Sequence, residues 1–201
     1  MRWDNLFDDL EGQLEQELSA EELDVRAEEE RLRLGRLSLR DRIVAIHEAQ
    51  GRDSEVGIRL FLADGTPLAL VPQTFGRDWF SADLIDDSSR KAQVIVPLAS
   101  IGSVVLTREQ AAVSLAATPS ELSQTSLPAR LTMSFVLRDL CRRRASVEVR
   151  MSTGPLFGTI DRVGRDHLDL AVHEQGEARR ESAVREFRAI PLSQVLLVTL
   201  R

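Results

Sequence analysis

Three side chains of types that bind metal ions occur close together in this sequence, at His167, Asp169 and His173. Their spacing places them on one face of a predicted β-strand, because side chains alternate along a strand with a period of two. His167 and His173 are six residues apart, which at about 3.3 Å per residue is roughly 20 Å and too far for one ion. We therefore predict a solvated strand face here and no metal site.

Residue patterns typical of enzymes are missing from the sequence. The pairs Asp8-Asp9 and Asp86-Asp87 are adjacent, and adjacent side chains point to different sides of the chain, which does not suit general acid–base catalysis. Cys141 is the single cysteine, which excludes an internal disulfide and a multi-thiolate metal site. Glycines stand singly at predicted turns and form no phosphate-binding loop. We predict no catalytic residue, no metal and no cofactor, and therefore not an enzyme.

Basic residues concentrate near the C-terminus, although the net charge of the protein is −6. Residues 135–201 carry 12 basic and 9 acidic residues, whereas residues 1–37 carry 5 basic and 12 acidic residues. A basic groove is one requirement for binding nucleic acid, but aromatic stacking partners are scarce. Tyrosine is absent, and we expect Phe157 and Phe187 to face the core. The candidate contacts for RNA are Arg138, Arg142, Arg143, Arg144, Arg179 and Arg180.

An acidic amphipathic helical arm is predicted over residues 1–37. Its large apolar side chains recur at helical spacing and form one stripe, the form used by helices that dock into a groove on another protein. The alternative is that the stripe packs on its own chain or on a second copy. A strand tryptophan predicted to point outward either anchors an interface or covers the seam between barrel and helix. The predicted partner-binding residues are Trp3, Leu6, Phe7, Leu10, Leu14 and Trp79.

The remaining chain contains an internal repeat that positions these side chains. Leu39-Arg-Asp in the first module matches Leu137-Arg-Asp in the second. The turn Gly76-Arg-Asp matches Gly164-Arg-Asp, and in both modules an apolar residue followed by proline precedes the last strand. Because the landmarks keep the same order, we expect two modules of the same fold after the arm.

Each module has the pattern of a small β-rich domain. Short runs of β-branched and apolar residues alternate with glycine turns, and a helix precedes the first strand. Five strands of this length suit a small barrel. The predicted class is therefore α+β, mainly β, with two five-stranded SH3/Sm-like barrels. The predicted boundaries are 1–37 for the arm, 38–107 for the first barrel with its leading helix, 108–125 for a linker, and 126–201 for the second barrel with its leading helix.

The segment from Val147 to Leu170 resembles the first motif of Sm-like proteins within the SH3-like barrel class, with Gly158 opening a bent second strand. Sm proteins bind single-stranded RNA, so the resemblance implies a possible RNA role. The asparagine that Sm proteins place after the second strand is absent, and Ile190-Pro191-Leu192 replaces their second motif. The RNA site therefore does not transfer. The whole chain also resembles an actinobacterial family with tandem barrels of this kind and no assigned activity.

The sequence contains no apolar run near the roughly 20 residues of a membrane-spanning helix. Residues 1–18 are acidic and amphipathic, unlike a secretory leader, so we expect a cytoplasmic protein with no membrane partner. We predict a non-enzymatic adaptor or scaffold that makes protein–protein contacts through the N-terminal helix and the paired barrels. The alternative is an Sm-like RNA-binding protein that uses the arginines of the second module.

Overall fold

The computed structural model describes residues 22–51, 57–85, 92–116, 127–176 and 179–200. Its helices cover residues 22–36 and the segments α2 (Leu39–Gln50), α3 (Arg108–Ala116), α4 (Leu127–Arg130) and α5 (Met133–Arg142). Among the described residues, no helix is long and apolar enough to cross a membrane. The strands of the first module are β1 (Ile58–Leu62), β2 (Pro67–Phe75), β3 (Trp79–Leu84), β4 (Gln93–Pro97) and β5 (Ile101–Val105), and those of the second are β6 (Ser146–Met151), β7 (Gly154–Val163), β8 (His167–Val172), β9 (Glu186–Pro191) and β10 (Leu197–Leu200).

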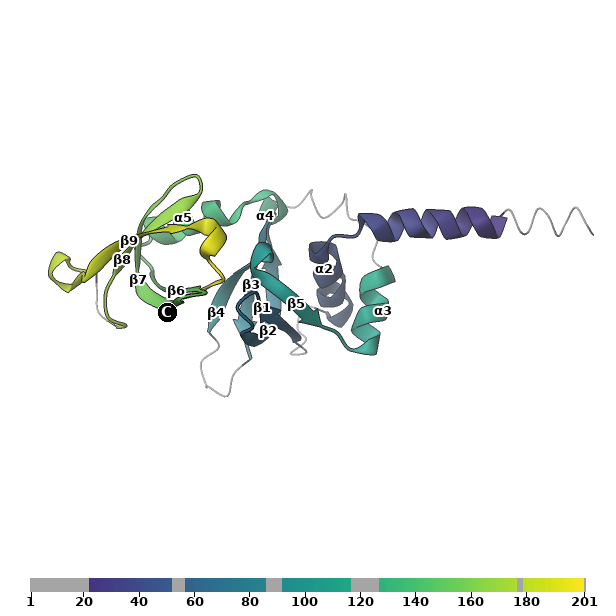
Figure 1. Ribbon diagram of the computed structural model, residues 1–201, viewed down its shortest axis with the longest axis horizontal. Helices are drawn as coiled ribbons and strands as arrows, with labels where there is room; N and C mark the ends of the chain where they lie inside the picture. The colour runs from purple at the N-terminus through teal and green to yellow at the C-terminus, as the bar shows by residue number, and fades with distance from the viewer. Residues whose placement is uncertain (1–21, 52–56, 86–91, 117–126, 177–178, 201) are drawn as a thin grey trace, which may run out of the picture.

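All of these strands belong to one 10-stranded antiparallel sheet, so the prediction of two separate five-stranded barrels is wrong. The strand order is β5-β1-β2-β3-β4-β10-β6-β7-β8-β9, and the two end strands are not paired with each other (Figure 1). The physical reason is that β10 pairs with β4 of the first module as well as with β6 of its own. The edge that would close the first module is therefore occupied by a strand of the second.

The repeat is nevertheless visible in the strand order. The first module has the order β5-β1-β2-β3-β4, and the second has the equivalent order β10-β6-β7-β8-β9. The long second strand of each module is bulged at the same place, between Pro72 and Thr74 in β2 and between Ile160 and Arg162 in β7. A bulge bends a strand and increases its twist, so each module curves its sheet around a core.

Each leading helix is tied to the glycine turn of its own module. Ser38 caps α2 in a capping box with Asp41, which satisfies backbone N–H groups that a helix start otherwise leaves without partners. Arg40 of α2 donates from Nε to the Gly76 carbonyl at 2.8 Å. Arg138 of α5 makes the equivalent contact from Nη2 to the Gly164 carbonyl at 3.2 Å. These arginines hold helix and turn together in both modules.

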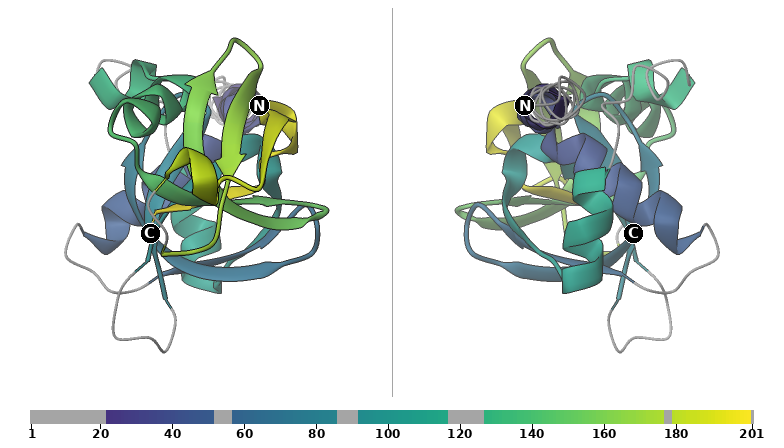
Figure 2. Two further views of the ribbon diagram at one scale, coloured as in Figure 1. Left: turned by 90° about the vertical axis from the view of Figure 1, so that its left-hand side faces the viewer. Right: turned by 90° about the vertical axis from the view of Figure 1, so that its right-hand side faces the viewer.

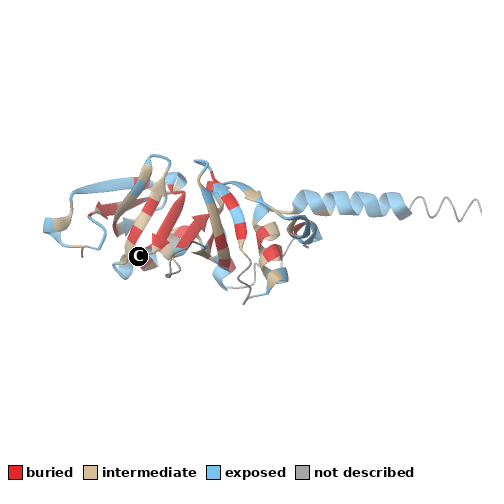
Figure 3. Cartoon of the chain, turned by 90° about the horizontal axis from the view of Figure 1, so that it is seen from below, coloured by how far each residue is buried: buried red, intermediate tan, exposed pale blue. Residues whose placement is uncertain are grey.

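Two hydrophobic cores lie side by side, and each takes residues from the other module. Trp79 and Ile95 of the first module are buried in the core formed by α5 and the strands of the second. Leu196 and Leu197 of the second module are buried in the core of the first, which includes the fully buried Phe80. Figure 3 shows buried residues on both sides of the junction. Separating the modules would expose all four exchanged side chains to water, which is unfavourable.

Gly158 lies where β6 and β8 both pair with β7, opposite Val147 and Val172. A Cβ atom at this position would lie 2.3 Å from the backbone oxygen of Ala171, so the neighbouring strand would have to move.

We expect Gly158→Ala to lower the free energy of unfolding by about 1–3 kcal/mol, the usual cost of overpacking. The measurement is urea denaturation followed by circular dichroism. Gly35→Ala is the control, because a Cβ atom there has no heavy atom within 4 Å, and it should not destabilise the protein. Equal stability of Gly158→Ala and the unsubstituted protein would contradict the close approach of β7 and β8.

Candidate protein-binding surfaces

The junction shows how one module of this protein binds another. Its strand part is the antiparallel pairing of β4 with β10, in which Ile95 is opposite Val198. Ser100 adds a side-chain contact by donating from Oγ to the Leu196 carbonyl at 2.8 Å. Arg150 of β6 also contacts the first module, with Nη1 3.3 Å from the Thr66 hydroxyl. Strand pairing and polar side-chain contacts therefore act together.

The turn before β3 forms the second part of the junction. The backbone N–H of Arg77 and the ring N–H of Trp79 both donate to the Leu131 carbonyl, at 2.9 and 3.0 Å. Asp78 accepts from the backbone N–H of Met133 at 2.8 Å. Met133 begins α5, and the N-cap residue Thr132 makes no capping hydrogen bond of its own. Asp78 therefore supplies the cap of a helix in the other module.

The position of Trp79 bears on its predicted role. Its side chain is 5% exposed and belongs to the core of the second module. It covers the seam between the first module and the helix of the second, which is one of the two alternatives left by the sequence. Trp79 is an anchor within the chain, and its ring is not available to a foreign partner.

The equivalent turn of the second module has the same backbone form but no module bound to it. The backbone N–H of Gly164 donates to the His167 carbonyl at 2.9 Å, just as the backbone N–H of Gly76 donates to the Trp79 carbonyl in the first module. Arg165, Asp166 and His167 are exposed. The imidazole Nδ1 of His167 lies 2.9 Å from an oxygen of Asp166, and this hydrogen bond raises the pKa of His167 and lowers that of the carboxyl group.

The four apolar residues exchanged at the junction have small or polar counterparts at the free ends of the sheet. Aligning the modules on Pro97 and Pro191, and on the two glycine turns, gives the correspondence. The two ends therefore lack the anchors that would join a second copy end to end as the modules are joined. The pairs, junction residue first, are Trp79 and His167, Ile95 and Ala189, Leu196 and Gly102, and Leu197 and Ser103.

Among the residues that the structure describes, strand β9 is a free edge, with a neighbouring strand on one side only. Residues 186–189 are all exposed, and Figure 2 shows this end of the molecule facing the viewer in its left-hand view. Phe187 is 66% exposed, so the prediction that it faces the core is wrong. The buried residue of β9 is Ile190, and Phe187 lies on the opposite face of the strand because three positions separate them. Phe157 is half-buried.

The helix over residues 22–36 projects from the body of the molecule and is exposed along almost its entire length (Figures 1 and 3). Its end is held by Arg33, which donates from Nη2 to the Leu115 carbonyl of α3 at 2.7 Å. Four large apolar side chains on this helix are between 38% and 62% exposed: Leu23, Val25, Leu32 and Leu34. The predicted arm residues Trp3, Leu6, Phe7, Leu10 and Leu14 lie outside the described residues.

Most of the predicted RNA-binding arginines are paired with carboxylates or carbonyls. Arg142 and Arg143 both contact Asp139 at 2.6 Å, which lowers the pKa of that carboxyl group. Arg138 donates to the Gly164 carbonyl, as its counterpart Arg40 does in the first module. Arg138 therefore holds the turn, and the Asp139 carboxylate partly neutralises the charge of Arg142 and Arg143.

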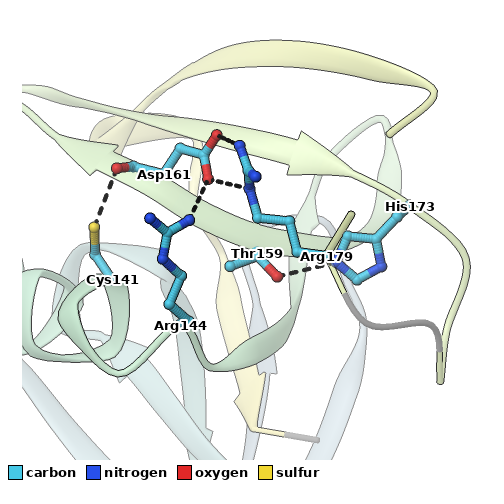
Figure 4. Close-up of polar contacts among 6 residues, drawn as sticks. All are labelled: Cys141, Arg144, Thr159, Asp161, His173 and Arg179. Atoms are coloured by element: carbon cyan, nitrogen blue, oxygen red, sulfur yellow. Dashed lines mark hydrogen bonds and ion pairs between the residues drawn. The ribbon is translucent and has the colours of Figure 1, made fainter. Parts of the chain in front are cut away.

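Two further arginines of the predicted set meet at one carboxylate (Figure 4). Arg179 forms two hydrogen bonds of 2.6 Å with Asp161, and Arg144 lies 3.9 Å from the same group. Cys141 donates from Sγ to the Asp161 backbone oxygen at 3.2 Å. This cluster ties α5 to the bulge of β7. Arg180 is exposed beside it.

His173 is buried, which corrects the prediction of a solvated strand face. Its Nε2 lies 3.0 Å from the Thr159 hydroxyl and its Nδ1 lies 3.0 Å from the Glu174 backbone oxygen (Figure 4). Both ring nitrogens are therefore satisfied within the protein. His167 is exposed, and no group of three or more metal-binding side chains is found among the described residues.

We expect Asp78→Ala to lower the free energy of unfolding by about 0.5–2 kcal/mol, because it removes the cap of α5. Asp166→Ala is the matched control: this residue occupies the same position in the repeated turn but caps no helix among the described residues. It loses only an exposed hydrogen bond to His167, so it should destabilise the protein less than Asp78→Ala. Chemical denaturation of both variants makes the comparison. Equal effects at the two positions would show that Asp78 does not act through the junction.

Comparisons with protein-family models, curated protein sequences and solved structures find no significant match to this chain. The resemblance to Sm-like proteins and to an actinobacterial tandem-barrel family is therefore untested by relatives. The exposed surfaces with binding potential are the projecting helix and the open edge of β9. The junction between the modules is already filled by groups of the chain itself.

Proposed function

We propose that the protein is a non-enzymatic adaptor that acts in the cytoplasm and binds a protein partner through its N-terminal helix. The observation that carries this proposal is the projection of residues 22–36 away from the body with four large apolar side chains exposed. Adaptors bind by presenting such side chains to a groove on another protein. The sheet then serves as a rigid base for the helix.

The energetics of short helices support this role. An isolated helix of about 12–15 residues is marginal in water, and most helical stability in proteins comes from packing an apolar face. Leu23 and Leu34 are eleven residues apart, which returns to the same face of a helix within about 20°, whereas Val25 and Leu32 lie on the opposite side. The face that a partner would cover is therefore the one with Leu23 and Leu34. Burying one leucine side chain is worth about 1.5–3 kcal/mol. A partner that covers this face would stabilise the helix and gain affinity from it.

The alternative function, RNA binding, has less support from the geometry. Arg142, Arg143 and Arg179 each contact a carboxylate at 2.6 Å, and Arg138 is used to hold the turn. An arginine that binds phosphate must give up such a partner, which reduces the net gain. Among the described residues of the second module, two exposed aromatic side chains could stack on a base: Phe135, on the same helix as Arg138 and Arg142, and Phe187, which lies beside a glutamate of its own strand.

The test is affinity capture with the full-length chain from cells of its source, with and without nuclease treatment. We expect the partner protein to be captured in the same amount after nuclease treatment. The amount captured by the variant Leu23→Glu/Leu34→Glu should be at least tenfold lower, because the loss of two leucine contacts exceeds the 1.4 kcal/mol that corresponds to a tenfold change in affinity.

Arg31→Glu is the control for this experiment. It changes the net charge by the same two units as the double variant but removes no apolar side chain, and its guanidinium is exposed and paired only with Glu28 at 3.3 Å in the described structure. Capture should remain close to that of the unsubstituted chain. Undiminished capture by the double variant would refute the helix as the binding element, and loss of capture on nuclease treatment would favour RNA binding.

A further inference from the structure

The free edge of β9 has backbone groups directed away from its own sheet. The backbone N–H of Leu192 donates to the Asp166 carbonyl at 2.8 Å. This hydrogen bond lies one position beyond His167 and Pro191, which are the last paired residues of β8 and β9. Hydrogen-bonded and non-hydrogen-bonded pairs alternate along an antiparallel ladder. The backbone groups of Ile190 and Arg188 therefore face β8, and those of the residues between and beside them, Phe187 and Ala189, face outward.

The first module shows what such an edge accepts. By the same alternation, the backbone of Ile95 in β4 faces away from β3, and there it meets Val198 of β10 in an antiparallel pair. Ala189 is the counterpart of Ile95 in the repeat. In the first module the strand equivalent to β9 thus binds an antiparallel strand at this edge. Unpaired strand edges are also known templates for pairing with another chain.

The side chains of β9 specify which strand fits. Glu186, Phe187 and Arg188 follow one another, and when this triplet pairs with itself in antiparallel register about Phe187, each Glu186 lies opposite Arg188 of the second copy. Opposite charges directly across an antiparallel pair stabilise it. Both side chains are about half exposed, at 47% and 46%, and are already in contact at 2.7 Å within one chain, so they lie on one face and can reach across it.

The aromatic residue adds to this complementarity from the other face of the strand. Phe187 is the most exposed phenylalanine of the described residues, at 66%. In the register centred on it, the two Phe187 side chains are direct cross-strand neighbours, an arrangement in which aromatic pairs attract. The register centred on Arg188 would instead place two guanidinium groups opposite each other, which is unfavourable. One register therefore satisfies charge and apolar surface together.

We propose that β9 pairs with β9 of a second copy in antiparallel register centred on Phe187, forming a two-fold dimer. Two-fold dimers are the commonest protein oligomers and use the same patch on both copies. End-to-end joining of copies through β9 and β5 is disfavoured, because Gly102 and Ser103 stand where the junction has Leu196 and Leu197. The dimer extends the sheet across the axis and carries two N-terminal helices.

The test is sedimentation velocity of the full-length protein over a range of concentrations. We expect a reversible monomer–dimer equilibrium. Glu186→Arg should raise the dimer dissociation constant at least tenfold, because it places arginine opposite arginine twice. Arg188→Glu should weaken the dimer similarly by placing glutamate opposite glutamate. Both residues are exposed, so circular dichroism should show that each variant is folded.

Charge-swap rescue makes the test specific to this register. The double variant Glu186→Arg/Arg188→Glu restores opposite charges across the axis and should return the dissociation constant to within about threefold of the original. An equimolar mixture of the two single variants should form a heterodimer, since one chain then supplies two arginines and the other two glutamates. Neither rescue is expected if the substitutions act by local unfolding.

A protein that remains monomeric at high concentration would overturn the proposal, as would single variants that dimerise normally or a double variant that is not rescued. A ladder of species larger than the dimer would indicate end-to-end joining instead and would also overturn it. This result is separate from the proposed function, because capture of a partner by the N-terminal helix is measured with Leu23→Glu/Leu34→Glu, and neither substitution touches β9.

Discussion

The pairing of β10 with two strands at once determines the architecture of this protein. One side of β10 completes the second module against β6, and the other side continues the sheet into β4 of the first. The side chains follow the backbone: Leu196 and Leu197 enter one core, and Trp79 and Ile95 enter the other. Because each core contains residues of both modules, the two modules stabilise each other, and their single sheet does not close on itself.

The same junction determines which surfaces remain for binding. It uses the edge of β4, the turn around Asp78 and the ring of Trp79, so these groups are internal to the chain. Their counterparts on the second module, β9 and the turn around Asp166, are exposed and carry different side chains. The repeat thus yields one filled interface between the modules, with β9 and β5 as the two end strands of the sheet. Together with the projecting helix, the edge of β9 gives the molecule two surfaces at its opposite ends (Figure 1).

Charge alone is a poor guide to the function of the second module. Its excess of arginine invites an RNA-binding interpretation, yet Asp139 and Asp161 each receive two arginines within the fold. A guanidinium that forms two hydrogen bonds with one carboxylate has a fixed position and a structural partner. Arg144 links the end of α5 to Asp161 at the bulge of β7, and Arg138 links α5 to the turn before β8.

The sequence by itself determined the repeat, the α+β character and the turns, because these depend on local patterns such as Gly76-Arg-Asp and Gly164-Arg-Asp. It also predicted that side chains point alternately to the two faces of each strand, but this alternation does not say which face meets a core. For that reason the sequence placed Phe187 in the core and His173 in solvent, whereas Phe187 is exposed and His173 is buried. The apolar run Val94-Ile95-Val96 is a signal that β4 is buried on both faces. Only the tertiary structure decided that β10 lies beside it, since that pairing joins segments about a hundred residues apart and depends on the burial that both modules gain together.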